Sequence, residues 1–313
     1  MLLNNTTSQA TAPFSTLWTS TDIFSLINLV AILLTNGTTL FVYARCSQLR
    51  SNTFSLYLIN LLISNVFKAL TAPVEIIQHL AVRKDQSAAY CATLIALGYT
   101  SNAVMMHNHV LITMNRVWAI TFPVGYRNYH SRRTAVVLCV AMWVYVFVWL
   151  LPGIIVDGVW YHVATGSNCM LNNAIPAQRN WNMAAQVIVY TLPIFVVILA
   201  YPLIWYKRQR QRRLRPTESI ISQKEPTSLP SDKDERRQHS HSFKVLTLLT
   251  ISVLVCWTPL TVYYDLLVFG EVDVGGLYEG GWVLWEIEPV FDPLLFAVAL
   301  KTLREELKRL LCW

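Results

Sequence analysis

Seven long apolar runs, separated by polar segments, divide this sequence. They lie near residues 22–45, 54–79, 90–118, 134–156, 182–206, 243–268 and 282–300. A helix needs about 20 apolar residues to cross the hydrocarbon core of a bilayer. Because backbone polar groups in lipid must bond within the spanning segment, each run predicts a transmembrane α-helix. The runs are too long and too continuous for the strands of a membrane β-barrel.

The composition also favours a membrane protein. Hydrophobic types make up 54% of the 313 residues and charged types 14%, whereas a soluble domain carries about 25% charged residues. We therefore expect an all-α membrane protein, with an extracellular N-terminus at residues 1–21 and a seven-helix bundle at residues 22–300. Leucines at helical spacing oppose charged residues after the last run, so residues 301–313 predict a short amphipathic membrane-surface helix and tail.

Lys and Arg are distributed unequally between the two sets of loops. The loops after the first, third, fifth and seventh runs are basic, whereas the alternate loops hold only Arg83, Lys84 and Arg179. Basic loops favour the cytoplasm, so we expect the N-terminus outside and the C-terminus inside at the plasma membrane. Residues 207–242 then form the third intracellular loop, and their polar composition predicts partial disorder.

Several residues outside the bundle are candidates for covalent modification. Asn4 and Asn5 begin overlapping Asn-x-Thr triplets on the predicted outer side, where they could be glycosylated. Cys312 follows the amphipathic segment and either carries a palmitoyl chain or stays a free thiol. Cys91 and Cys169 each lie at the edge of an apolar run, where an oxidising exterior would let them pair.

Charged residues interrupt the second and seventh runs. Lys68 lies three residues after Asn65, on the same face of a helix. Since an isolated charge in lipid is costly, we predict that Lys68 pairs with an acid of the seventh run, namely Glu286, Glu288 or Asp292. Together with Asn36 and Asn65, these residues would form an intramembrane polar network. The network is either purely structural or responsive to ligand or pH.

The two histidines of the third run do not predict a metal site. His107 and His109 are two residues apart, so they lie on different faces of a helix. We expect His109 to face the bundle and to form a hydrogen bond. No cofactor, metal or nucleic acid is indicated, and no nucleophile–base motif points to an enzyme.

Short motifs occur in a fixed order along the apolar runs. They are Asn36; Asn60 with Asn65; Asn115-Arg116; Trp143 with Pro152; Pro193 with Tyr201; Cys256-Trp257-Thr258-Pro259; and Asp292-Pro293-Leu294-Leu295-Phe296. In this order and spacing they resemble the rhodopsin-like (class A) G-protein-coupled receptors over about residues 25–311. Each motif is weak alone, and the specificity lies in their joint occurrence.

The resemblance implies a role for each motif. Cys91 and Cys169 would form the disulfide between the third span and the second outer loop. Arg116 would engage the G protein or Tyr201 in the active state. Further residues of the activation switch would be Trp257 and Pro259, which form the toggle and kink beneath the ligand pocket, and the prolines Pro193 and Pro293, which bend their helices.

The sequence departs from the family pattern at several switch positions. Asn115 replaces the acid that holds the neighbouring arginine at rest, and Asn cannot form an equally strong charge-assisted bond. The resemblance therefore predicts basal activity. Asn65 and Asp292 exchange the usual acid and amide, so sodium modulation is not assumed. Phe296 replaces a tyrosine and removes a hydroxyl that would face Tyr201.

The resemblance also restricts the ligand. Gly98 stands where amine receptors have an aspartate, and Glu286 stands where opsins have the retinal lysine, so neither a monoamine nor retinal is expected. The predicted pocket wall comprises Tyr99, Asn102, Trp257, Tyr264, Trp285 and Glu286. The acidic third outer loop favours a basic ligand, such as a peptide.

These observations predict a membrane receptor that binds an extracellular ligand and activates a heterotrimeric G protein. Two alternatives remain open at this point. The charged residues of the second and seventh runs could line the path of a seven-span transporter or channel. The changes at Asn115 and Phe296 are also compatible with a decoy receptor that does not signal.

Overall fold

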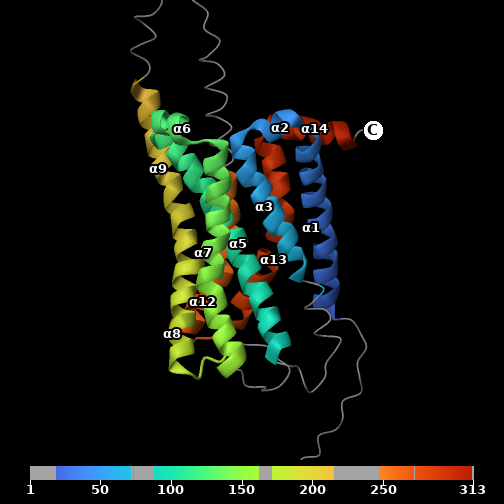
Figure 1. The fold of residues 1–313 in the computed structure, drawn as a ribbon, viewed down its shortest axis with the longest axis vertical. Helices are drawn as coiled ribbons and strands as arrows, with labels where there is room; N and C mark the ends of the chain where they lie inside the picture. Colours follow the sequence, from blue (N-terminus) through green and yellow to red (C-terminus); the bar gives the residue numbers. More distant parts are fainter. Residues whose placement is uncertain are drawn as a thin grey trace, which may run out of the picture.

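The computed structural model describes residues 19–71, 73, 88–161, 171–214, 247–270 and 272–311. In chain order its α-helices are α1 (Ser20–Arg45), α2 (Ser47–Ser51), α3 (Thr53–Ala69), α5 (Ala88–Thr121), α6 (Pro123–Tyr129), α7 (Arg132–Val156), α8 (Pro176–Ala185), α9 (Leu192–Leu214), α12 (Thr258–Gly270), α13 (Gly275–Ala299) and α14 (Lys301–Leu311). The long helices pack side by side into one bundle (Figure 1). Asn4, Asn5, Cys169, Cys312 and most of residues 207–242 lie outside the described residues.

The all-α fold predicted from the sequence is confirmed, since every predicted run coincides with a helix where it is described. Within the described residues, and by length and apolar composition alone, four helical stretches could cross a membrane, namely Ser20–Arg45, Arg132–Tyr161, Pro176–Lys207 and Thr247–Gly270. The remaining runs correspond to α3, α5 and α13, which bury polar and charged side chains inside the bundle.

The outer surface of the bundle is apolar. Val137, Val140, Val144 and Val148 follow each other along α7 at helical spacing and are all more than half exposed. Soluble monomers rarely expose a continuous apolar stripe of this kind. A hydrocarbon environment accounts for it, because lipid is as apolar as these side chains.

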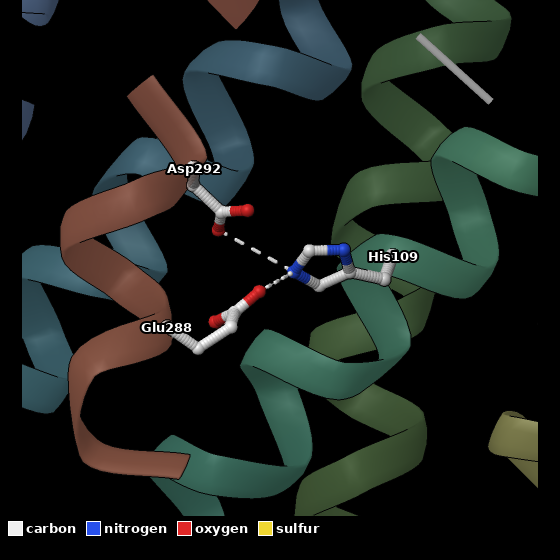
Figure 2. A group of neighbouring side chains, drawn as sticks. All are labelled: His109, Glu288 and Asp292. Carbon is white, nitrogen blue, oxygen red and sulfur yellow. Dashed lines mark ion pairs between the residues drawn. The ribbon is translucent and has the colours of Figure 1, made fainter. Parts of the chain in front are cut away.

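Helix α5 runs through the centre of the bundle and packs against α3, α7 and α9. Its middle is closely packed, since Ala103, Val104 and Met105 are fully buried. This position leaves His109 of α5 facing two side chains of α13 (Figure 2).

Two of the predicted proline bends follow π-helical turns. The turn η2 (Gln186–Thr191) precedes Pro193, and η4 (Val253–Trp257) precedes Pro259. Proline lacks the N–H that would continue the helical ladder, and a π-turn is a common way for a helix to absorb such a defect. Each bend lies beside the aromatic core of the bundle.

Helix α14 lies at the same end of the molecule as α2 and α6 (Figure 1). Leu303 anchors it and is fully buried, and α14 packs against α13 and α1. The opposite face carries the exposed residues Lys301, Glu305 and Arg309. The helix has the amphipathic character expected from its sequence.

Candidate functional site

A cavity of about 180 Å³ lies between α3, α5, η2, α12 and α13. Its lining residues are Lys68, Tyr99, Asn102, Gln186, Tyr190, Leu260, Thr261, Tyr264, Tyr278, Trp282, Trp285 and Glu286. Five of the six residues named from the sequence as pocket wall are among them. Trp257 is not among them, because it is fully buried and stacks against Trp285 outside the lining.

An ion pair occupies one side of this cavity. Lys68 Nζ lies 2.5 Å from Glu286 Oε1, and the two side chains are only 4% and 16% exposed. Of the three acids named from the sequence, Glu286 is therefore the one that Lys68 contacts. Each charge offsets the desolvation cost of the other, and neither faces the cavity as an isolated ion.

Hydrogen bonds hold the polar groups around the cavity in place. Trp285 Nε1 donates to Asn102 Oδ1 at 3.0 Å, and the Tyr190 hydroxyl donates to the Tyr99 carbonyl at 2.9 Å. Gln186 Nε2 donates to Asp265 Oδ1 at 3.1 Å. The first two contacts join α5 to α13 and η2, and the third joins η2 to α12, so a ligand would meet a largely preformed aromatic site with few polar groups.

Three of the cavity residues that were not predicted from the sequence follow helical periodicity from residues that were. Tyr278 and Trp282 lie seven and three residues before Trp285, and Thr261 lies three residues before Tyr264. Residues at these spacings share a helix face. Extending each named position along its face would have found them.

Trp285 lines the cavity and forms its floor, and Trp257 stacks against Trp285 outside the lining. Trp257 and Trp285 stack with ring centroids 5.1 Å apart and an interplanar angle of 23°. The ring of His109 meets Trp257 edge-on, also at 5.1 Å. Trp257, Trp285 and His109 therefore link η4, α13 and α5 through aromatic contacts.

His109 faces two acids of α13 (Figure 2). Its Nε2 atom lies 2.8 Å from Glu288 Oε1 and 3.4 Å from Asp292 Oδ2, and all three side chains are fully buried. His109 does face the bundle, as expected. His107 points elsewhere, with Nδ1 2.8 Å from the Ala103 carbonyl, so the two histidines do not converge.

An amide cluster adjoins the triad. Asn36 Nδ2 donates to the Pro289 carbonyl at 2.9 Å, and Asn65 Nδ2 donates to Asn36 Oδ1 and to Asp292 Oδ2, each at 3.0 Å. Pro293 has no N–H to offer the Pro289 carbonyl four residues earlier. The asparagines satisfy that freed carbonyl, which stabilises the bend of α13.

At the end of the bundle that carries α6, Asn115 takes part in an uncharged network. Its Nδ2 lies 3.0 Å from His130 Nε2, which is also 2.8 Å from the Tyr57 hydroxyl. The Tyr126 hydroxyl donates to Asn115 Oδ1 at 3.4 Å. Burial lowers the pKa of His130 from its ordinary value, and the nearby Arg116 guanidinium lowers it further.

Arg116, the neighbour of Asn115, is buried at the same end. Its guanidinium carbon lies 3.1 Å above the centre of the Phe54 ring, an attractive cation–π geometry. Phe296 is 1% exposed and belongs to the aromatic and aliphatic core. Tyr201 packs against a separate small cluster formed by Ile120 and Ile204.

Cys91, at the start of α5, is disulfide-bonded. The resemblance names Cys169 as its partner, and Cys169 lies outside the described residues. Cys46, Cys139 and Cys256 are free thiols.

Comparison with known proteins identifies the class of this fold. Residues 35–295 match the model of the 7-transmembrane receptor (rhodopsin) family, and the chain belongs to that family. It is therefore a membrane receptor and not an enzyme. The family also implies a multi-pass plasma-membrane protein.

Its individual relatives are distant. The D(1C) dopamine receptor of Xenopus laevis is 23% identical over 267 residues, which cover 80% of this chain and 56% of the relative. The D(5)-like dopamine receptor of Takifugu rubripes is 25% identical, covering 79% and 56%, and melanopsin of Felis catus is 22% identical, covering 90% and 58%. The chain thus spans about half the length of these relatives.

Proposed function

We propose that this receptor couples to a heterotrimeric G protein through the inner end of α5 and signals without ligand. The observation behind this proposal is the local environment of Arg116. Instead of an acid beside it, Arg116 has Asn115, whose side chain contacts His130 and Tyr126. An amide beside Arg116 cannot form the charge-assisted bond that a carboxylate would form, so Asn115 opposes the release of Arg116 less than an acid at that position would.

We propose further that the ligand is not a monoamine, although two of the relatives are dopamine receptors by name. Gly98 has open space around its missing side chain and offers no carboxylate. The carboxylate of Glu286 is neutralised by Lys68. Asp273 lies just before α13, and Glu279 lies in α13 next to Tyr278, which lines the cavity. They would attract a basic ligand, and a peptide end could enter the cavity.

The orientation that goes with this function has its N-terminus outside. It places the cavity toward the exterior and Arg116 toward the cytoplasm. Cys91 would then tie α5 to Cys169 of the second outer loop in an oxidising environment. A transporter or channel is disfavoured by membership of the receptor family.

The test is a G-protein activation assay in cells, without added ligand and at matched surface expression. Wild type, Arg116→Ala and Arg45→Ala would be compared, because Arg45 is an exposed arginine at the end of α1. We expect activity above background in wild type and Arg45→Ala, and its loss in Arg116→Ala. Equal activity in all three would contradict the role of Arg116.

Silence of the wild type would reject basal activity, and a panel of basic peptides would then separate a ligand-dependent receptor from a decoy. A peptide response that requires Arg116 would support coupling through α5. Peptide binding without any G-protein response would favour the decoy.

A further inference from the structure

The triad of His109, Glu288 and Asp292 has more acceptor atoms than the structure satisfies. Within the described part of the chain, Glu288 Oε2 and Asp292 Oδ1 are buried and have no hydrogen-bond partner. Buried polar atoms are nearly always paired, so each such atom indicates a missing partner. Two unpaired carboxylate oxygens on one helix, facing one imidazole on another, indicate a partner that accepts electron pairs.

The spacing of the donor atoms fits a metal ion. Ligands of Zn²⁺ lie about 2.0–2.2 Å from the metal in a tetrahedral arrangement, which places them about 3.3 Å apart. His109 Nε2 is 2.8 Å from Glu288 Oε1 and 3.4 Å from Asp292 Oδ2. One donor atom from each residue lies within 4.8 Å of the others, so small carboxylate rotations suffice to surround an ion.

Charge balance favours a divalent ion. Glu288 and Asp292 are fully buried, and two carboxylates in an apolar interior need compensating positive charge. Lys68 does not supply it, because Lys68 Nζ pairs with Glu286, and a protonated His109 would supply only one positive charge for the two carboxylates. A dication with two carboxylates and a neutral imidazole is electrically neutral, which removes most of the cost of burial.

We propose that His109, Glu288 and Asp292 form a zinc site that links α5 to α13. The imidazole of His109 favours a transition metal such as Zn²⁺, because nitrogen ligands suit transition metals, whereas sites of oxygen ligands alone suit alkali and alkaline-earth ions. Asn65 supports the site from outside the triad, because its Nδ2 donates to Asp292 Oδ2 at 3.0 Å and orients that carboxylate.

The site would also affect the floor of the cavity. The ring of His109 packs edge-on against Trp257, which stacks on Trp285. A metal that fixes His109 would restrict Trp257 and hold the third and seventh spans together. Zinc should therefore stabilise the arrangement of helices described here.

The test uses the purified full chain in detergent, stripped of metal with a chelator. Co²⁺ serves as a spectroscopic probe, since a site of nitrogen and oxygen ligands gives visible ligand-field absorption, and Zn²⁺ is then added as competitor. The variants are His109→Gln and Asp292→Asn. The matched control is His107→Gln, which removes a buried histidine of the same helix that faces the Ala103 carbonyl and the Tyr145 ring.

We expect one tight equivalent of Co²⁺, displaced by Zn²⁺, in wild type and in His107→Gln. Affinity should fall by more than about 10-fold in His109→Gln and Asp292→Asn. Zinc should raise the unfolding temperature of wild type and His107→Gln and leave that of His109→Gln unchanged.

Two results would overturn the proposal. One is the absence of tight binding to stripped wild type that elutes as a folded, monodisperse species. The other is equal binding by wild type and His109→Gln, which would assign the metal to surface groups. If His109→Gln does not fold, the same comparison is made with Asp292→Asn, which removes one charge and keeps the shape of the side chain.

Discussion

At the scale of single residues, the ion pair of Lys68 and Glu286 adds charged groups to a cavity that is otherwise largely aromatic. Both residues line the cavity, and both are largely removed from solvent. Removing one partner of a buried pair leaves the other charge uncompensated, which costs far more than the intact pair contributes. The pair therefore matters for the integrity of the bundle as well as for ligand selection.

Replacing Lys68 by Met should destabilise the receptor by about 3 kcal/mol, because Glu286 is left as an unpaired buried carboxylate. The measurement is the unfolding temperature in detergent together with surface expression. A second change, Glu286→Leu, should restore much of the loss. Lys301→Met is the control, since Lys301 pairs with Glu305 at 3.5 Å on the surface, where such pairs contribute about 0–1 kcal/mol. Equal effects of the two lysine changes would refute the buried pair.

His130 gives its network with Tyr57, Asn115 and Tyr126 a defined pH dependence. Burial and Arg116 lower its pKa below the ordinary value of 6.5, so the unfolded chain binds a proton at pH values where the folded chain does not. The stability from neutral His130 is therefore present above about pH 6.5 and is lost as the pH falls toward the lowered pKa. The physical reason is that protonated Nε2 can no longer accept a hydrogen bond from Asn115.

We expect the unfolding temperature of wild type to exceed that of His130→Gln at about pH 7.5, and the difference to shrink at about pH 5.5. Gln keeps a polar side chain and does not titrate, so the difference between the two proteins isolates His130. A difference that does not vary with pH would contradict this assignment.

At the scale of elements, α12 and α13 approach each other at one glycine. A Cβ atom added to Gly281 would lie 2.8 Å from the backbone nitrogen of Leu260, whereas one added to the neighbouring Gly280 would meet nothing within 4 Å. Backbone cannot yield as a flexible side chain can. The contact between these helices therefore depends on the absence of a side chain at Gly281.

Gly281→Ala should lower stability by about 1–3 kcal/mol through overpacking, and it should also displace Tyr278 and Trp282 at the cavity. Gly280→Ala is the matched control, which should be neutral or slightly stabilising because Ala favours helix. Thermal unfolding of both variants decides the matter. Similar behaviour of the two would show that the helices can separate without cost.

The sequence was sufficient to locate the long helices, because hydrophobic periodicity and length reflect the bilayer directly. It missed the short helices α2 and α6, which carry no apolar run of their own. It also ended the fifth span at residue 206, whereas α9 continues to Leu214 through Lys, Arg and Gln. These residues are good helix formers that need no burial.

At the scale of the whole molecule, the contacts between distant helices were the part that the sequence left open. A salt bridge of Lys68 with the seventh span followed from the cost of a charge in lipid, but three acids remained as partners. The triad of His109, Glu288 and Asp292 was not predicted, since more than 170 positions separate His109 from the two acids and no motif joins them. Only the packing of α5 beside α13 brings them together.

Basic residues gather at one end of the bundle. They are Arg45 at the end of α1, Arg50 in α2, Arg132 at the start of α7 and Lys301 at the start of α14. Basic residues favour the cytoplasmic side of a membrane. Cysteines introduced at Ser131 and at Gly276 would report on the two ends, since both positions are exposed. A membrane-impermeant maleimide should label Gly276→Cys on intact cells and label Ser131→Cys only after permeabilisation. The unsubstituted chain gives the background from native thiols. The reverse pattern would show that the receptor has the opposite orientation in the membrane. Arg116 would then lie outside the cell, where it could not contact a G protein.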